Sequence, residues 1–271
     1  MDIFKIILLL LIFTILSFYI IEFNSNKINY GFLPKNIYVF WDKGFQNMPN
    51  MCKKCVNSWI TKNPEYKVIV LDKSNIYNYL DKEFLDKVWT KNQIQTQSDL
   101  IRINLLSRYG GIWVDATLFC IKPLKSWLKN NFKSSLFMFK YHCGDCTKTN
   151  IASWFIASCK NCYLTNEMAY DYNNYWSDKI KSDNYFNFHE VVNKTIFKNS
   201  HSKYVYGKIP FLEGYKYRAI FHGINYITFY NFDKIKHKNF KELPLIKFNQ
   251  RWEKFNKEKN KTDFIDYLIQ I

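Results

Sequence analysis

The sequence contains few acidic residues, and it lacks the signatures of proteins that bind nucleic acids. Asp and Glu together number 23 against 39 Lys and Arg, which gives a formal net charge of +16. A balance this basic favours a polyanionic partner. The lysines, however, are spread along the whole chain, and there is neither a zinc-finger spacing nor an RNA-recognition motif. We therefore predict a lysine-rich solvated surface and no nucleic-acid partner.

A site for signal-peptide cleavage is also missing. Residues 6–21 form an apolar run without a charged residue, and with the residues before it the run approaches the roughly 20 residues that a helix needs to cross a bilayer. Bulky residues follow where cleavage needs a small-x-small pattern. The sequence thus predicts a single-pass membrane anchor over 1–23, a linker over 24–32 and one domain over 33–271. The flanking lysines do not orient the anchor, so a Golgi-type membrane and a bacterial inner membrane stay equally open.

The rest of the chain shows no internal repeat and no second domain boundary. Short β-branched and aromatic runs predict strands, and longer runs with apolar residues at helical spacing predict helices. The expected strands cover 36–41, 67–71, 112–114, 136–141 and 154–157, and the expected helices cover 51–61, 95–109 and 164–175. The strand, helix and strand within 36–71 form a βαβ unit, which predicts an α/β fold with a mostly parallel sheet flanked by helices.

An acidic residue lies at the end of one of these strands. The helix over 95–109 stops at Gly110 and Gly111, since glycine suits the left-handed position after a helix. The strand that follows ends at Asp115. In open α/β sheets ligands bind beyond the carboxyl ends of the strands, so Asp115 is a candidate site residue. On the preceding helix Asp99 and Arg102 are three residues apart and therefore share one face.

Residues 95–120 (QTQSDLIRINLLSRYGGIWVDATLFC) resemble two known groups of enzymes. The order Ser-Asp-x-x-Arg, then Gly-Gly-x-Trp-x-Asp-Ala-Thr, covers Asp99, Arg102, Trp113, Asp115 and Thr117. It resembles the glycosyltransferases with a DXD sugar-binding motif, which include Golgi α-mannosyl- and α-galactosyltransferases. It is more similar still to the capsular polysaccharide synthesis protein family. Further blocks similar to that family occur in the same order at 34–41, 53–59, 63–73, 150–158 and 185–189, so the resemblance spans about 33–246.

The resemblance implies a GT-A-like fold and a glycosyltransferase. Such an enzyme moves a hexose from a UDP- or GDP-sugar to a glycan or a lipid-linked glycan, and the DXD relatives retain the anomeric configuration. The catalytic residues that the resemblance implies are Asp99, Arg102 and Asp115. The donor-binding residues that it implies are these three together with Phe40, Trp41, Trp113 and Thr117. In this reading Asp99 and Arg102 hold the ribose and sugar, Asp115 reaches the ribose or a metal ion, and the two aromatic residues at 40 and 41 lie beside the base.

The motif departs from the DXD pattern at its last position. Thr117 stands where the DXD group has a second aspartate, and a neutral hydroxyl is a much weaker ligand for a hard cation than a carboxylate. Dependence on Mn²⁺ or Mg²⁺ therefore stays open. The residues that would hold such an ion together with the phosphates are Asp115, Thr117 and His189, with His222 as an alternative to the first histidine.

The cysteines allow a different interpretation. Six of the seven form C-x-x-C pairs, at 52/55, 143/146 and 159/162, and Cys120 is left over. The pair at 52/55 falls on an expected core helix, whereas the pair at 143/146 suits a local disulfide or half of a zinc site with 159/162. The alternative function is thus a non-catalytic membrane-anchored protein, with a degenerate donor pocket or with a cysteine–metal module that binds a partner.

Overall fold

The structure is a computed structural model that describes residues 12, 14, 31–91, 93–141, 151–182, 184–212, 242–248 and 269–270. The chain divides into two units, Met1–Tyr30 and Gly31–Ile271. The described strands all belong to the second unit. The fold described below is therefore that of the second unit.

The first βαβ unit forms as predicted. β1 (Asn36–Phe40), the 3₁₀ helix η1 (Phe45–Asn47), α2 (Asn50–Lys62) and β2 (Lys67–Leu71) follow one another along the chain. β1 and β2 pair in parallel over their whole length. Trp59 on the buried face of α2 donates its indole N–H to the carbonyl of Leu118 at 2.7 Å. This bond holds α2 against a later part of the chain.

The predicted helix, glycine stop and strand before Asp115 are also confirmed. η2 (Ile76–Asn78), α3 (Lys82–Trp89) and α4 (Ile94–Tyr109) lead to β3 (Gly111–Val114), which pairs in parallel with β1. Gly110 has φ 65°, and a Cβ there would lie 2.4 Å from the backbone nitrogen of Lys160. Only glycine fits this turn, because the conformation is left-handed and the neighbouring backbone leaves no space for a side chain. Asp115 therefore follows directly on the end of a buried strand.

The other half of the sheet differs from the prediction. β4 (Leu118–Cys120) and α5 (Leu124–Asn131) precede β5 (Leu136–Lys140) and β6 (Ile151–Ser158). β6 runs antiparallel to both β3 and β5, and the strand order is β2-β1-β3-β6-β5. The sheet is mixed, so the prediction of a mostly parallel sheet is wrong. A parallel crossover needs about a dozen residues or more and usually a helix. Residues 141–150 are too few for one, and β6 returns beside β5 in the opposite direction.

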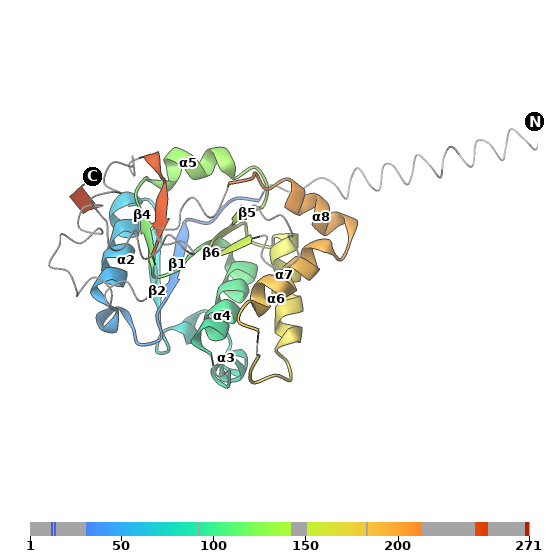
Figure 1. Cartoon of the computed structure of the whole chain (residues 1–271), viewed down its shortest axis with the longest axis horizontal. Helices are drawn as coiled ribbons and strands as arrows, with labels where there is room; N and C mark the ends of the chain where they lie inside the picture. Colours follow the sequence, from blue (N-terminus) through green and yellow to red (C-terminus); the bar gives the residue numbers. More distant parts are fainter. Residues whose placement is uncertain are drawn as a thin grey trace, which may run out of the picture. The chain divides into compact units, whose positions relative to one another are not determined.

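Helices cover both faces of this sheet (Figure 1). α6 (Tyr163–Tyr175), α7 (Asn187–Phe197) and α8 (Ser200–Gly207) follow β6, and α6 packs against α4 and α7. Figure 1 shows α4, α6 and α7 on one side of the sheet and α5 on the other. β7 (Leu245–Lys247) pairs antiparallel with β4, with Lys247 opposite Leu118. This second, two-stranded sheet brings residues 245–247 to the end of β3.

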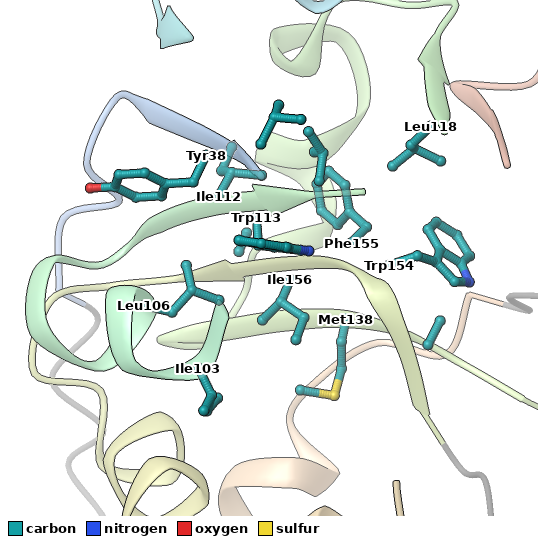
Figure 2. Close-up of a cluster of buried hydrophobic side chains, with 14 of the residues drawn as sticks. Tyr38, Ile103, Leu106, Ile112, Trp113, Leu118, Met138, Trp154, Phe155 and Ile156 are labelled. Atoms are coloured by element: carbon teal, nitrogen blue, oxygen red, sulfur yellow. The ribbon is translucent and has the colours of Figure 1, made fainter. Parts of the chain in front are cut away.

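The core lies on both faces of β6 (Figure 2). Successive strand residues point to opposite faces, and Figure 2 shows Ile156 on the side of Ile103 from α4, with Phe155 on the other side. The ring of Phe155 lies 5.4 Å from that of Trp127 on α5 and 6.1 Å from that of Trp59 on α2. β6 thus ties the two helical layers together, and it fixes the neighbouring strand β3 on which Asp115 depends.

The N-terminal transmembrane helix of the predicted fold is not supported. Among the residues described, no helix is long and apolar enough to cross a membrane. Within 1–23 only Ile12 and Thr14 are described, so most of the predicted anchor lies outside the described residues. The prediction rested on the apolar run over 6–21 with the residues before it and on the missing cleavage site, and no described helix supports it. The fold is corrected to a mixed α/β sheet flanked by helices.

Candidate active site

A cavity of about 780 Å³ lies at the carboxyl ends of β1 and β3. The strand order reverses here, because β1 pairs with β2 on one side and with β3 on the other. Open α/β sheets bind ligands at such a switch point. The walls come from the ends of β1 and β3, the first turns of α4, the start of α7 and the end of β7. The polar and aromatic lining residues that matter most below are Trp41, Asp99, Arg102, Asp115, Thr117, His189 and Lys247.

Arg102 joins the two candidate carboxylates. Its Nη1 donates to Oδ1 of Asp99 at 2.6 Å, and its Nη2 donates to Oδ1 of Asp115 at 2.9 Å. The guanidinium is stacked between aromatic rings, 4.9 Å from the ring centroid of Trp113 and 5.7 Å from that of Phe188. A side chain only 5% exposed must have its charge paired, and a planar guanidinium holds two oxygens in a fixed geometry. The Asp-x-x-Arg spacing of α4 is therefore part of a buried network and not a surface ion pair.

The two carboxylates have different pKa values. Burial raises the pKa of Asp99 to about 6, with Arg102 opposing the rise and Asp115 adding to it. Burial acts on Asp115 as well, but Arg102, Lys247 and the indole N–H of Trp113 hold its pKa below the ordinary value. The Trp113 nitrogen lies 3.1 Å from Oδ1 of Asp115. The site therefore pairs a carboxylate that stays charged with one that titrates in mildly acidic solution.

β7 supplies a cation that the sequence patterns did not predict. Lys247 on β7 places its Nζ 3.5 Å from Oδ2 of Asp115. The same ammonium donates to the hydroxyl of Thr117 and, at 3.0 Å, to the carbonyl of Phe248. No local signal marks this lysine, because the contact with Thr117 joins residues 130 apart in sequence. The resemblance to the family, which spans about 33–246, also ends just before it.

Asp115 and Thr117 do not fit a divalent cation in this arrangement. Oδ1 of Asp115 already accepts from Arg102 and Trp113, and Oδ2 faces the Lys247 ammonium. The Thr117 hydroxyl accepts from the same ammonium. A metal ion placed between these oxygens would be repelled by the lysine. In the part of the chain that the structure describes, no group of three Asp, Glu, His or Cys side chains is placed to hold a metal ion.

The remaining predicted residues line other parts of the cavity. Phe40 stacks on Trp89, with ring centroids 6.4 Å apart. The indole N–H of Trp41 is buried and has no hydrogen-bond partner among the described residues. The indole N–H groups of Trp127 and Trp176 also lack a hydrogen-bond partner among the described residues, but only Trp41 of these three lines the cavity, where a ligand can supply the acceptor. His189 lies on α7 with its ring 5.9 Å from that of Phe186, and His222 is outside the described residues.

The described cysteines are buried. Cys52 and Cys55 lie on the inner face of α2, as predicted. Burial raises the pKa of Cys120 and of Cys159 to about 12, so both thiols stay protonated at neutral pH and are poor nucleophiles and metal ligands. The residues expected to form a local disulfide or to share a zinc ion with the pair at 159/162, those at 143 and 146, lie outside the described residues.

Comparison with known proteins gives a consistent set of matches. Residues 14–268 match the family described as capsular polysaccharide synthesis protein. The O-glycosyltransferase braB of Annulohypoxylon truncatum is 32% identical over 103 residues, which are 34% of this chain and 24% of that protein. The glycosyltransferase afumC of Aspergillus fumigatus is 33% identical over 102 residues, 33% of this chain and 26% of that protein. The match thus spans about a quarter of the length of each relative.

A solved structure, PaToxG Glycosyltransferase, is 17% identical with a TM-score of 0.46, covering 65% of this chain and 74% of that one.

Proposed function

This chain belongs to the capsular polysaccharide synthesis protein family, and from that membership we propose that it is a glycosyltransferase of polysaccharide or glycoconjugate synthesis. Its donor is a nucleotide diphosphate sugar, a UDP- or GDP-hexose, and its acceptor is a glycan or a lipid-linked glycan. Residues 33–271 form the transferase domain. The names of the two fungal relatives, an O-glycosyltransferase and a glycosyltransferase, support transfer of a sugar, and the first supports an oxygen of the acceptor as the atom that receives it.

One observation carries the proposal. Arg102 binds Asp99 from its own helix and Asp115 from the end of β3, and all three line one cavity at the switch point of the sheet. A network of one buried and two half-buried charges is costly unless it serves a ligand or a partner. Perturbed carboxylate pKa values in a cavity are likewise typical of functional sites. Both features favour a donor site over a structural ion pair.

The lining residues match the parts of a nucleotide diphosphate sugar. Ionised Asp99 and Asp115 accept hydrogen bonds from ribose and sugar hydroxyls, and Arg102 orients both carboxylates. The buried indole N–H of Trp41 donates to an acceptor on the nucleotide. Trp41 and Phe40, at the end of β1, form the apolar wall beside the base.

The transfer step proceeds with retention of configuration and needs no protein base. The bond between C1 of the sugar and the diphosphate oxygen breaks, and its electron pair stays on the departing diphosphate. The acceptor hydroxyl oxygen bonds to C1 from the same face. Its proton passes to the departing phosphate oxygen, so the products are the glycoside and the nucleoside diphosphate. The protein holds the reactants in position and supplies fixed charge, and these two effects lower the barrier most in reactions of this kind.

A donor-hydrolysis screen tests the proposal. The full chain is incubated with UDP- and GDP-hexoses, with and without Mn²⁺, and release of nucleoside diphosphate is measured. We expect one donor class to be hydrolysed and Arg102→Met to lose roughly a hundredfold or more in rate, about 2.7 kcal/mol. Arg108→Met is the matched control, since Arg108 lies on the same helix and pairs with the exposed Asp81. No hydrolysis of any donor, or equal rates for the two arginine variants, would refute the proposal.

A further inference from the structure

Lys247 stands where the motif would otherwise hold a metal ion. Its ammonium contacts the carboxylate of Asp115 and the hydroxyl of Thr117, the first and last residues of the Asp-Ala-Thr motif. We infer that Lys247 is the cation that neutralises the donor diphosphate, and that transfer by this protein needs no divalent metal ion. The inference rests on the proposed function, because it concerns the same donor site.

The backbone holds Lys247 in place before any ligand binds. β7 pairs with β4, which sets Lys247 opposite Leu118. Beyond the strand, the N–H of Phe248 donates to the carbonyl of Thr117 at 2.8 Å. The Lys247 side chain is 18% exposed and lines the cavity. A fixed positive charge stabilises a developing negative charge without the cost of reorienting at the moment of reaction.

The other cations of the described cavity wall are less suited to this role. The charged lining residues are Asp42, Lys43, Asp99, Arg102, Asp115 and Lys247, so acids and bases balance. Arg102 is buried and committed to two carboxylates, and Lys43 is exposed to solvent just after β1. A diphosphate that enters this balanced cavity brings negative charge into it. Lys247 is the cation next to the motif that remains in contact with the cavity.

The neutral side chain of Thr117, at the last motif position, suits a site in which a lysine takes the place of a metal ion. The charges of Asp99, Arg102, Asp115 and Lys247 sum to zero. An aspartate at 117 would cancel the lysine charge and leave the group negative, which calls for a metal ion. The neutral hydroxyl of Thr117 instead accepts a hydrogen bond from the ammonium and leaves its charge in place.

With Lys247 as the cation, the transfer step needs no further reactant. When the bond from C1 to the diphosphate breaks, negative charge grows on the departing oxygens. Lys247 donates hydrogen bonds to them and keeps its own proton, while the acceptor proton goes to the phosphate. Metal ions serve the same purpose in other transferases by neutralising that charge. The chemistry of the step is therefore complete without one.

The test measures donor turnover and nucleotide binding by the full chain, in excess EDTA and in added Mn²⁺ or Mg²⁺. Wild-type turnover in EDTA should lie within about threefold of the rate with metal, because the lysine supplies the charge. Lys247→Met should lose roughly a hundredfold or more in rate, as when one oxyanion donor is removed. It should bind UDP or GDP more weakly but bind uridine or guanosine unchanged, since the nucleosides lack phosphate. Lys247→Arg keeps the charge and should retain more turnover than Lys247→Met.

A control variant separates this role from packing. Lys140→Met removes another buried ammonium, one that donates to the carbonyls of Tyr206 and Ile209 outside the cavity lining, and should bind UDP or GDP as wild type does. Loss of wild-type turnover in EDTA, with recovery in Mn²⁺, would overturn the inference and leave the proposed function intact. Equal weakening of diphosphate and nucleoside binding in Lys247→Met would make Lys247 structural and also overturn it. A wild type that neither turns over nor binds any nucleotide would refute the proposed function, and this inference with it.

Discussion

Asp115→Asn keeps the volume of the side chain and removes its charge, so it separates a donor-site role from a structural one. In wild type, Oδ1 of Asp115 accepts from Arg102 at 2.9 Å and from Trp113 at 3.1 Å, and Oδ2 lies 3.5 Å from Lys247. The asparagine oxygen still accepts from the arginine and the indole. Its amide N–H₂ then faces the ammonium of Lys247, so one favourable contact becomes unfavourable. We expect a loss of about 1–3 kcal/mol in the free energy of unfolding, or roughly 2–12 °C in Tm.

The effect on turnover should be much larger than the effect on folding at 25 °C. The variant loses the carboxylate that accepts from the donor hydroxyls, and the fork of Arg102 loses one of its anionic partners. We expect kcat/KM to fall roughly a hundredfold or more, which is two factors of ten at about 1.36 kcal/mol each. Removal of the Asp115 charge should also lower the pKa of Asp99 from about 6, and shift the acid limb of the pH profile downward.

Turnover, pH profile and Tm are measured on one preparation, with Asp81→Asn as the matched control. Asp81 also pairs with an arginine, at 2.8 Å, but its side chain is 73% exposed and lies outside the cavity lining. The control should leave turnover unchanged and stability within about 0.5 kcal/mol. Turnover of Asp115→Asn within about threefold of wild type, together with the fall in Tm, would show that Asp115 is structural and would refute the site assignment.

Three further predictions concern Asp99 and the fold. Wild-type kcat/KM should fall as the pH drops through about 6, where Asp99 becomes protonated. The stability of Asp99→Asn relative to wild type should rise between about pH 4 and 6, because only wild type has a carboxyl with a raised folded pKa, and its ionisation lowers the stability of the folded state. A stability difference between the two proteins that does not change with pH, measured by urea unfolding, contradicts this. Gly110→Ala should lower the free energy of unfolding in urea by more than about 2 kcal/mol, since φ is 65° and the new Cβ would lie 2.4 Å from the backbone nitrogen of Lys160. Gly207→Ala is the control: a Cβ there meets nothing within 4 Å, so the free energy of unfolding should change by less than about 1 kcal/mol. Phe155→Ala should cost about 3–5 kcal/mol in the same assay, and a cost below about 1 kcal/mol would contradict the packing described for β6.

Local patterns were enough to predict the first half of the fold. The βαβ unit, the helix before Gly110 and the strand that ends at Asp115 depend on apolar periodicity and on glycine chemistry over short stretches, and the structure has all of them. The direction of β6 depends on pairing with two other strands, which no local pattern encodes. The transmembrane prediction used the apolar run and the missing cleavage site, and no described helix supports it.

The cavity likewise combines residues that are close in sequence with residues that only the tertiary structure brings together. Asp99, Arg102 and Asp115 lie within one short segment, so their spacing could be read directly from the sequence. Lys247 reaches Asp115 through the pairing of β7 with β4. Phe188 stacks on Arg102 from α7, and its contribution also depends on packing between distant elements. Lys247 and Phe188, which come from distant elements, were therefore harder to predict than the motif itself.

A crystal structure of the chain with UDP or GDP, grown in EDTA, tests the central claim most directly. We predict the nucleotide in the cavity at the carboxyl ends of β1 and β3, with a ribose hydroxyl within hydrogen-bond distance of Asp99 or Asp115. We further predict the diphosphate within hydrogen-bond distance of Lys247 and the indole N–H of Trp41 donating to the nucleotide. A nucleotide bound elsewhere on the chain, or one whose ribose lies away from both Asp99 and Asp115, would contradict the proposed donor site.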